Sequence, residues 1–433
     1  MTKVLLVGNG AREHAIAKAI VKSDEMPELF SYMKMQNPGI EEISTETMIG
    51  KYDDIDNIVA FAQSFSPDFA VIGPEEPLSY GVVDALESAG IPCVGPKKNL
   101  AMLESSKSFA RELMAKYKIE GLPKFGVFRN VEDAKKFMDS LKEVVIKPDG
   151  LTGGKGVMVQ GDHLMTKEEA LEYCKEVLKS HPSVIVEEKL DGEEFSLQSF
   201  TDGQTILDCP PVQDHKRAHN DDTGPNTGGM GSYSAENHLL PFLKENHIRE
   251  AHLITAKVAD AIKKEIGEPY IGIMYGGFML TKSGIKLIEY NARLGDPEAM
   301  NILSIMESDF VELCRAIVSM HLDDYSLQFE KKATVCKYIV PEGYPEKPVK
   351  GAIEISKASN SEVFYSSIER KDNKLYMSGS RAVAFVGKGK TIEEAERKAE
   401  EGAKSVKGKV FHREDIGTRK LIDKRINHVR SFS

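Results

Sequence analysis

The sequence predicts a multidomain α/β protein with an N-terminal doubly wound domain, a central α+β region and a small C-terminal mixed α+β domain. The 433 residues are too many for one hydrophobic core and suggest about three domains. The chain opens with an apolar strand that turns through glycines into a helix, as doubly wound sheets do. From about Ala333, short strands alternate with turns.

The bulk composition excludes several classes of protein. The formal net charge of -10 argues against a nucleic-acid partner, because phosphate backbones need a basic face. No apolar stretch is long enough to cross a membrane, and the apolar run at the start is too short for a signal peptide. Five scattered cysteines without a CxxC pair indicate neither a disulfide framework nor a zinc site. We therefore expect a cytoplasmic protein without nucleic-acid or membrane partners.

The first predicted strand, Lys3–Val7, leads into a glycine turn at residues 8–14 and then into a helix. Such a turn at a helix N-terminus is a place where anions bind. An NAD-linked oxidoreductase is the alternative, but Glu13 replaces the third glycine of GxGxxG and would lie beside a pyrophosphate. The second strand, near Leu29–Met35, also lacks a closing acidic residue. A small phosphate ester or a sugar fits this turn better than a dinucleotide.

The third predicted strand, residues 69–72, ends in Gly73-Pro74-Glu75. Ligands of such sheets bind beyond the carboxyl ends of the strands. Residues 8–13 and 73–75 are therefore expected to line one crevice. For Glu75, a solvated turn residue is an equally good interpretation at this point.

A glycine loop at Lys147–Val157 follows a helix at residues 106–117, a boundary at 121–123, a strand at 125–128 and a helix at 131–141. Lys147 and Lys155 bracket its glycines, between two apolar strands. It is not a Walker A loop, because it is one residue short and Gly156 stands where Ser or Thr should be. Phosphate binding is a better interpretation than a loose hairpin tip.

The next part of the chain contains an unusual polar segment, Gln213–Gly231. It follows a capped helix at 166–180, a strand at 184–186, an acidic run at 187–194 and a strand at 195–200. It is too long for an ordinary loop and mixes His, Arg and Asn with clustered glycines, which favours a functional loop over disorder.

A long helix at 245–266 leads to two hairpin strands, 271–280 and 285–289. Glu289 and Asn291 alternate along the second strand, so their side chains face the same way. A carboxylate with an amide oxygen is a hard ligand pair that suits magnesium. Arg293 projects from the same face, and a structural ion pair between Glu289 and Arg293 is the alternative.

Together, the glycine loop, the 213–231 segment, residues 288–298 and the first glycine turn carry a resemblance. With these motifs the chain closely resembles the ATP-grasp ligases, and specifically the phosphoribosylamine–glycine ligase family of purine biosynthesis. The similarity extends to Asp415-Ile416-Gly417. The stretches at 214–217, 222–231 and 295–298 are specific to that family, whereas many ATP-grasp enzymes share the glycine loop.

The resemblance implies an N-terminal pre-ATP-grasp domain at 1–104, an ATP-grasp domain of two α+β subdomains at 105–330, and a C-terminal domain at 331–433. A lid subdomain would span about 121–191. The implied reaction joins glycine to 5-phosphoribosylamine through a glycyl phosphate, giving glycinamide ribonucleotide, ADP and phosphate. The implied enzyme is a monomer or homodimer that uses ATP with Mg²⁺ or Mn²⁺.

The resemblance also assigns residues. Those implied for ATP are Lys107, Lys147, Gly153, Gly154, Lys155, Gly156, Glu187, Glu188, Lys189, Leu190 and Glu194. The glycine loop would close over the phosphates, the 187–190 backbone would pair with adenine, and Glu194 would bind the ribose. Those implied for substrate are Gly8, Asn9, Gly10, Arg12, Pro74, Glu75, Asp214, Lys216, Arg293, Gly295 and Asp296. Glu289 and Asn291 would hold the metal, and the implied catalytic residues are Arg293, Asp214 and Lys155.

One departure from the ATP-grasp pattern concerns the metal. Many of these enzymes carry a further ligand on the strand paired with that of Glu289, where this chain has Gly277. Two other functions remain open besides the oxidoreductase. One is a sister ATP-grasp ligase with another acid substrate, and the other is a non-catalytic nucleotide sensor.

Overall fold

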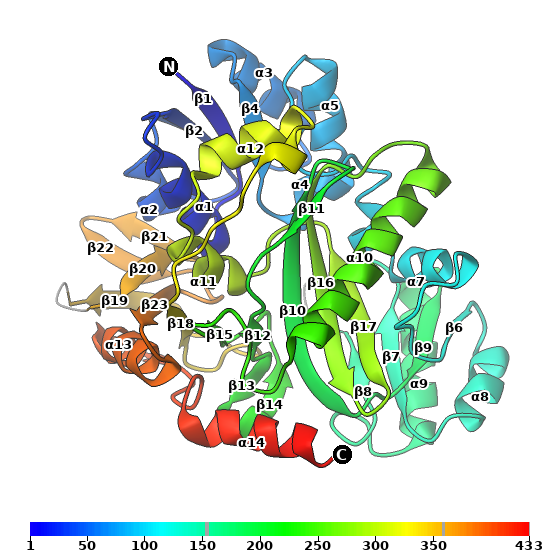
Figure 1. The fold of residues 1–433 in the computed structure, drawn as a ribbon. Helices are drawn as coiled ribbons and strands as arrows, with labels where there is room; N and C mark the ends of the chain where they lie inside the picture. Colours follow the sequence, from blue (N-terminus) through cyan, green and yellow to red (C-terminus); the bar gives the residue numbers. More distant parts are fainter. Residues whose placement is uncertain (152–155, 357–359, 433) are drawn as a thin grey trace.

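The computed structural model describes residues 1–151, 156–356 and 360–432 (Figure 1). The N-terminal sheet lies at one end, the lid and central sheets lie along one side, and the C-terminal helix runs along the opposite end. Within the described ranges, no helix is both long and apolar enough to cross a membrane.

The N-terminal region is a five-stranded parallel sheet of order β3-β2-β1-β4-β5. Its elements are β1 Lys3–Val7, α1 Ala11–Val21, β2 Glu28–Met33, α2 Pro38–Glu41, β3 Glu46–Ile49, α3 Ile55–Phe65, β4 Phe69–Ile72, α4 Glu75–Tyr80, α5 Val82–Ser88 and β5 Cys93–Val94. The strand order reverses between β1 and β4, and the carboxyl ends of these two strands continue into Gly8 and Gly73. The predicted doubly wound fold is confirmed, and its switch point lies between β1 and β4.

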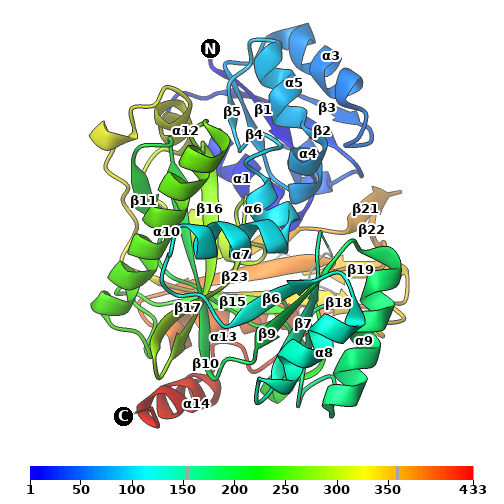
Figure 2. The same cartoon turned by 90° about the vertical axis from the view of Figure 1, so that its right-hand side faces the viewer.

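The lid is an antiparallel sheet of order β6-β9-β7-β8. Its elements are β6 Phe125–Phe128, α8 Val131–Asp139, β7 Val144–Pro148, β8 Met158–Val159, α9 Lys167–Ser180 and β9 Val184–Glu188. Thr166 caps α9 by accepting the N–H of Glu169, as the sequence predicts. Apolar residues of the sheet and both helices form a hydrophobic cluster of their own. The lid is therefore a separate packing unit, as Figure 2 shows.

The central sheet has the order β11-β10-β16-β17. Its strands and flanking helices are α6 Met102–Ser105, α7 Lys107–Lys116, β10 Gly192–Thr201, β11 Ile206–Asp208, α10 Glu245–Ile266, β16 Gly272–Thr281 and β17 Gly284–Asn291. Helix α10 ends at Gly267, whose φ of +85° suits a left-handed C-cap. In the β16–β17 register, Gly277 lies directly opposite Glu289. The predicted pairing is thus confirmed: Gly277 stands opposite Glu289, where many ATP-grasp enzymes carry a further metal ligand.

The polar segment is ordered, and much of it is strand. It forms β12 Gln213–Asp214, β13 Arg217–His219, β14 Thr223–Asn226 and the start of β15 Gly231–Ser234. The expectation of one long loop is wrong in this respect, because β13 and β14 pair with each other and β12 pairs with β15. Strand β15 then pairs with β18 of the C-terminal region. The C-terminal sheet therefore incorporates strands from the polar segment.

The C-terminal region consists of this sheet, of order β12-β15-β18-β23-β20, and a smaller one, β21-β22-β19-β24. The remaining elements are α11 Glu298–Ser304, α12 Phe310–Val318, β18 Ala333–Pro341, β19 Gly351–Ile355, β20 Glu362–Tyr365, β21 Ile368–Lys371, β22 Lys374–Met377, β23 Val383–Gly389, α13 Ile392–Lys404, β24 Val406–Lys407, β25 Val410–Phe411 and α14 Arg419–Arg430. Two short 3₁₀ turns lie at Asn220–Asp222 and Leu322–Asp324. This mixed α+β region matches the predicted class.

Candidate active site

A cavity of about 790 Å³ lies where the N-terminal sheet, the lid, the central sheet and the C-terminal region meet. Its lining includes Arg12 and Glu75 from the first region, Lys147 from the lid and Arg381 from the C-terminal region. Figure 2 shows the lid sheet alongside the sheet that carries β17. The cavity thus contains most of the residues that the sequence assigns to substrates.

At the lid side, Lys147 is the penultimate residue of strand β7 and is almost fully buried. Its Nζ lies 2.8 Å from Oε2 of Glu187 and donates to the carbonyl of Ile288 at 3.1 Å. Arg111 donates from Nε to Oε1 of Glu187 at 2.6 Å and from Nη2 to the same Ile288 carbonyl. Burial alone would raise the pKa of Glu187, but Arg111 and Lys147 outweigh it and lower that pKa to about 2. This network fixes two cations, Lys147 and Arg111, in the cavity wall.

Backbone hydrogen bonds within the lid limit which groups of residues 187–190 can contact adenine. The N–H of Glu188 donates to the carbonyl of Lys124, and the N–H of Lys189 donates to that of Glu143. These two N–H groups are already used within the lid, so pairing with adenine falls to other backbone groups of the segment. The side chain of Glu187 serves in the ion pairs instead of facing solvent.

The entry to the glycine loop is held on helix α7. Lys107 Nζ donates to the carbonyl of Gly150 at 2.7 Å. The Asp149 carboxylate accepts from the N–H and hydroxyl of Ser108 and from the hydroxyl of Ser183. At the far end, the Tyr173 hydroxyl donates to the carbonyl of Gly156. The predicted residues Gly153, Gly154 and Lys155 lie outside the described residues.

Glu289 and Asn291 both line the cavity, on the face expected from their alternation. Lys216 Nζ lies 3.8 Å from Oε1 of Glu289 and 3.2 Å from Oε2 of Glu194. Burial would raise the pKa of Glu289, yet nearby lysines and Arg293 lower it, so its carboxylate is anionic. An anionic carboxylate and an amide oxygen directed into one cavity fit a hard divalent cation. Gly277 adds no side-chain ligand.

Arg293 forms a different ion pair from the one considered as the alternative. Its Nε lies 3.1 Å from Oε2 of Glu75, and its Nη2 lies 2.9 Å from Oε1 of Glu104. Burial would raise the pKa of Glu75, but Arg293 and Arg12 lower it to about 2. Glu75 begins α4 and lines the cavity, so the interpretation as a solvated turn residue is wrong.

The first glycine turn already contains an anion, the side chain of Glu13. Its carboxylate accepts the N–H of Gly10 at 2.6 Å and the Nε–H of Arg12 at 2.5 Å. Gly8 has a φ of +141°, and a Cβ there would lie 2.2 Å from Cγ of Glu13. Since Glu13 fills the position where a pyrophosphate would bind, the geometry excludes the dinucleotide interpretation. Asn9 is held by a hydrogen bond from the Tyr52 hydroxyl.

The polar segment, residues 213–231, and the residues after β17 meet at another wall of the cavity. Burial, followed by the charge of Glu298, raises the pKa of Asp214 well above its ordinary value. Asp296 accepts from the Tyr338 hydroxyl at 2.6 Å and pairs with Arg381 Nη2 at 2.9 Å. Pro74, Lys216 and Gly295 also line the cavity.

Several site residues escaped the sequence reasoning, namely Glu104, Arg111, Tyr338, Arg381 and Arg425. Arg381 is typical, because it donates to the carbonyls of Gly228 and Gly229 in the polar segment as well as to Asp296. Its own neighbourhood in the sequence contains no motif. Only the tertiary contact reveals it.

This arrangement defines a class of protein. An antiparallel lid that carries a buried lysine, beside a second sheet that carries a Glu-x-Asn pair, is the architecture of an ATP-grasp enzyme. Family models for the phosphoribosylglycinamide synthetase N domain, ATP-grasp (A) domain and C domain match residues 2–104, 105–299 and 334–419. The chain belongs to the phosphoribosylamine–glycine ligase family.

Individual relatives agree with this assignment. The phosphoribosylamine–glycine ligase of Methanocella arvoryzae is 47% identical over 99% of this chain and 99% of its own length. That of Methanocaldococcus jannaschii is 50% identical over 98% of both chains. The crystal structure of the Thermotoga maritima phosphoribosylamine–glycine ligase superimposes with a TM-score of 0.81 at 30% identity, covering 96% of this chain and all of that one. The resemblance drawn from the motifs is confirmed.

Proposed function

We propose that the chain is the ligase that joins glycine to 5-phosphoribosylamine in purine biosynthesis, with ATP converted to ADP and phosphate. The γ-phosphoryl group of ATP passes to the glycine carboxylate and forms glycyl phosphate. The amine of phosphoribosylamine then attacks the acyl carbon, an amide forms, and phosphate leaves. Family membership supports this substrate set, and the intermediate follows from the chemistry, since a free carboxylate is a poor acyl donor.

One observation carries the proposal. Lys147, Glu289 and Arg293 line the same cavity although they come from the lid, from β17 and from the turn after it. Phosphoryl transfer depends mainly on positioning and on neutralising charge, so it needs cations and metal ligands more than acid–base groups. A nucleotide sensor needs adenine contacts but not this set.

For ATP, we propose that Lys107 and Lys147 contact the phosphates and that residues 153–156, with Lys155, close over them. Residues 187–190 would contact adenine, and Glu194 would bind the ribose. Glu289 and Asn291 would hold Mg²⁺ or Mn²⁺, which when bound neutralises charge on phosphate oxygens.

For the other substrates, Arg293 stabilises charge on the phosphoryl group in transfer. Asp214 lines the same cavity, and we assign to its carboxylate the role of accepting the proton that the amine loses on attack. The residues proposed to hold phosphoribosylamine are Gly8, Asn9, Gly10, Arg12, Pro74, Glu75, Asp214, Lys216, Gly295 and Asp296. Because Gly10 already donates to Glu13, the turn would act through its other groups.

We propose domains at 1–104, 105–330 and 331–433, with the lid at about 121–191. Strands β12 and β15 of the second domain complete the sheet of the third, which supports a closely joined pair. We also propose a monomer or homodimer, without nucleic acid or membrane as partner, that works in the cytoplasm.

The test is release of ADP by the purified protein. ADP should form only when glycine, phosphoribosylamine, ATP and Mg²⁺ are all present. Formate, bicarbonate or alanine in place of glycine should give no turnover. ADP release with one of these acids but not with glycine would assign the chain to a sister ligase, and none with any acid would indicate a sensor.

A further inference from the structure

Glu104, near the end of α6, is a buried carboxylate with two contacts at the active site. Its Oε1 lies 2.9 Å from Nη2 of Arg293, and its Oε2 accepts the N–H of Ala292 at 2.7 Å. One carboxylate thus holds both the guanidinium and the backbone directly before it. Ala292 follows the end of β17, which carries the proposed metal ligands.

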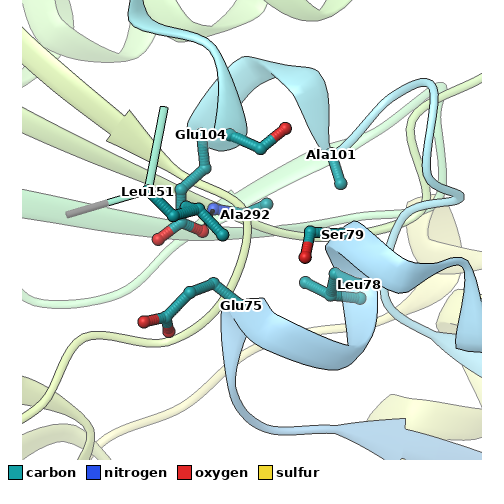
Figure 3. A pocket seen from close by; sticks show the side chains of 8 residues that line it. Glu75, Leu78, Ser79, Ala101, Glu104, Leu151 and Ala292 are labelled. Atoms are coloured by element: carbon teal, nitrogen blue, oxygen red, sulfur yellow. Dashed lines mark hydrogen bonds between the residues drawn. The ribbon is translucent and has the colours of Figure 1, made fainter. Parts of the chain in front are cut away.

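Glu75 contacts the same guanidinium from another element, but its surroundings differ. Both residues line the cavity, but the side chain of Glu75 is 29% exposed and that of Glu104 only 6%. Figure 3 shows the two side chains on facing helices, with a small recess between them. Leu151, within the glycine loop, also lines this recess. The contact between Glu104 and Arg293 is therefore shielded from water.

Burying Glu104 as a second carboxylate beside the Arg293 guanidinium lowers the stability of the fold. Burial raises the pKa of Glu104 to about 7; the charge of Arg293 opposes that rise, and the charge of Glu75 adds to it. Arg12 and Tyr270 also interact with this carboxylate. Arg293 already has Glu75 as a counter-ion, so charge compensation does not explain Glu104. The contacts of Glu104 explain its presence, because they fix the direction of the Arg293 guanidinium.

We propose that Glu104 is the positioning residue of Arg293 in phosphoryl transfer. It holds the guanidinium at the cavity wall and ties the end of β17 to helix α6, which joins the N-terminal sheet to the rest of the chain. The inference rests on the role given to Arg293 in the proposed function.

The test uses Glu104→Gln, which keeps the shape and an acceptor for the Ala292 N–H but removes the charge, and Glu104→Asp, which keeps the charge but shortens the reach. Both should lower kcat by about 100-fold, since misplacing a catalytic group by roughly 1 Å has that effect. KM for ATP should stay within about twofold, because Arg293 and the N–H of Ala292 occupy both carboxylate oxygens of Glu104. Glu76→Gln is the matched control, as Glu76 is a half-exposed neighbour of Glu75 that pairs with Lys34.

Each outcome decides the matter. Unchanged kcat in either Glu104 variant overturns the positioning role, and so does a loss confined to KM. A Glu104→Gln protein that fails to fold also overturns it, because Arg293 retains Glu75 and the costly buried charge is gone. Wild-type protein without glycine-dependent turnover would instead refute the proposed function, so the two failures are distinguishable.

Discussion

Lys147 and Glu187, on neighbouring strands of the lid, form an ion pair with Nζ 2.8 Å from Oε2. Arg111 of α7 joins the same carboxylate at 2.6 Å. The pair therefore ties the lid to the helix that precedes it, and it holds Lys147 in place before ATP arrives.

Glu187→Gln should destabilise the fold. The change leaves Arg111 and Lys147 buried without their shared anion, which typically costs about 3 kcal/mol. Urea unfolding followed by circular dichroism measures the loss. Glu188→Gln is the control, because the Glu188 carboxylate accepts a hydrogen bond from the backbone N–H of Lys124 at an exposed position. Equal midpoints for the two variants would contradict this account of the network.

Glu289→Ala should abolish turnover and leave the fold intact. Loss of an anionic metal ligand removes several kcal/mol of charge stabilisation, so kcat should fall by more than about 100-fold. Glu194→Ala is the matched variant, because Glu194 also pairs with Lys216 but is assigned to the ribose. It should raise KM for ATP and spare kcat. A Glu289→Ala enzyme with full activity would show that the metal binds elsewhere.

Stability should fall as the pH drops below about 6.5, in part through His14. Burial lowers the pKa of His14 to about 3, and its Nδ1 accepts the N–H of Tyr365 from the C-terminal sheet. Between pH 6.5 and 3 the unfolded chain binds a proton there that the folded chain does not bind. Folding therefore loses about 1.4 kcal/mol per pH unit, or roughly 2 kcal/mol at pH 5.

The measurement is the free energy of unfolding at pH 7 and pH 5 for the wild type and for His14→Phe. The variant should lose less stability between these two values, whatever its absolute stability. His321→Gln, at an exposed position, should keep the wild-type difference. An unchanged difference in His14→Phe would refute the assignment.

Arg425→Gln should weaken substrate binding more than catalysis. Arg425 of α14 lies with Nε 3.3 Å from Oε2 of Glu193 and also pairs with Asp222 in the polar segment. It joins two parts of the cavity wall, although α14 lies almost entirely beyond the residues 334–419 matched by the C-domain family model. KM values should rise several-fold with kcat little changed. Arg419→Gln is the control on the same helix. Arg419 pairs with Asp423 at the surface, so this variant should behave as wild type.

The sequence was informative wherever function depends on neighbours in the chain. The glycine turn, the capped helix α9, the 245–266 helix and the alternation of Glu289 with Asn291 are all local patterns, and the structure contains each of them. Glu13 already argued against a dinucleotide, and its carboxylate does occupy the position in the glycine turn where a pyrophosphate would bind.

Contacts between distant segments could not be predicted in this way. Glu104 is 188 residues from Ala292, and Arg381 is 85 residues from Asp296. Neither residue stands in a motif, because its role arises only when two elements pack together. The same holds for β12 and β15, whose place in the C-terminal sheet depends on pairing with β18.

Glycine labelled with oxygen-18 in its carboxyl group tests the central claim most directly. If the carboxylate is phosphorylated, one labelled oxygen must leave with the phosphate when the amide forms. Mass spectrometry of the released phosphate should therefore show one labelled oxygen per turnover, with the other retained in glycinamide ribonucleotide. Unlabelled phosphate accompanied by ADP would contradict the glycyl phosphate route.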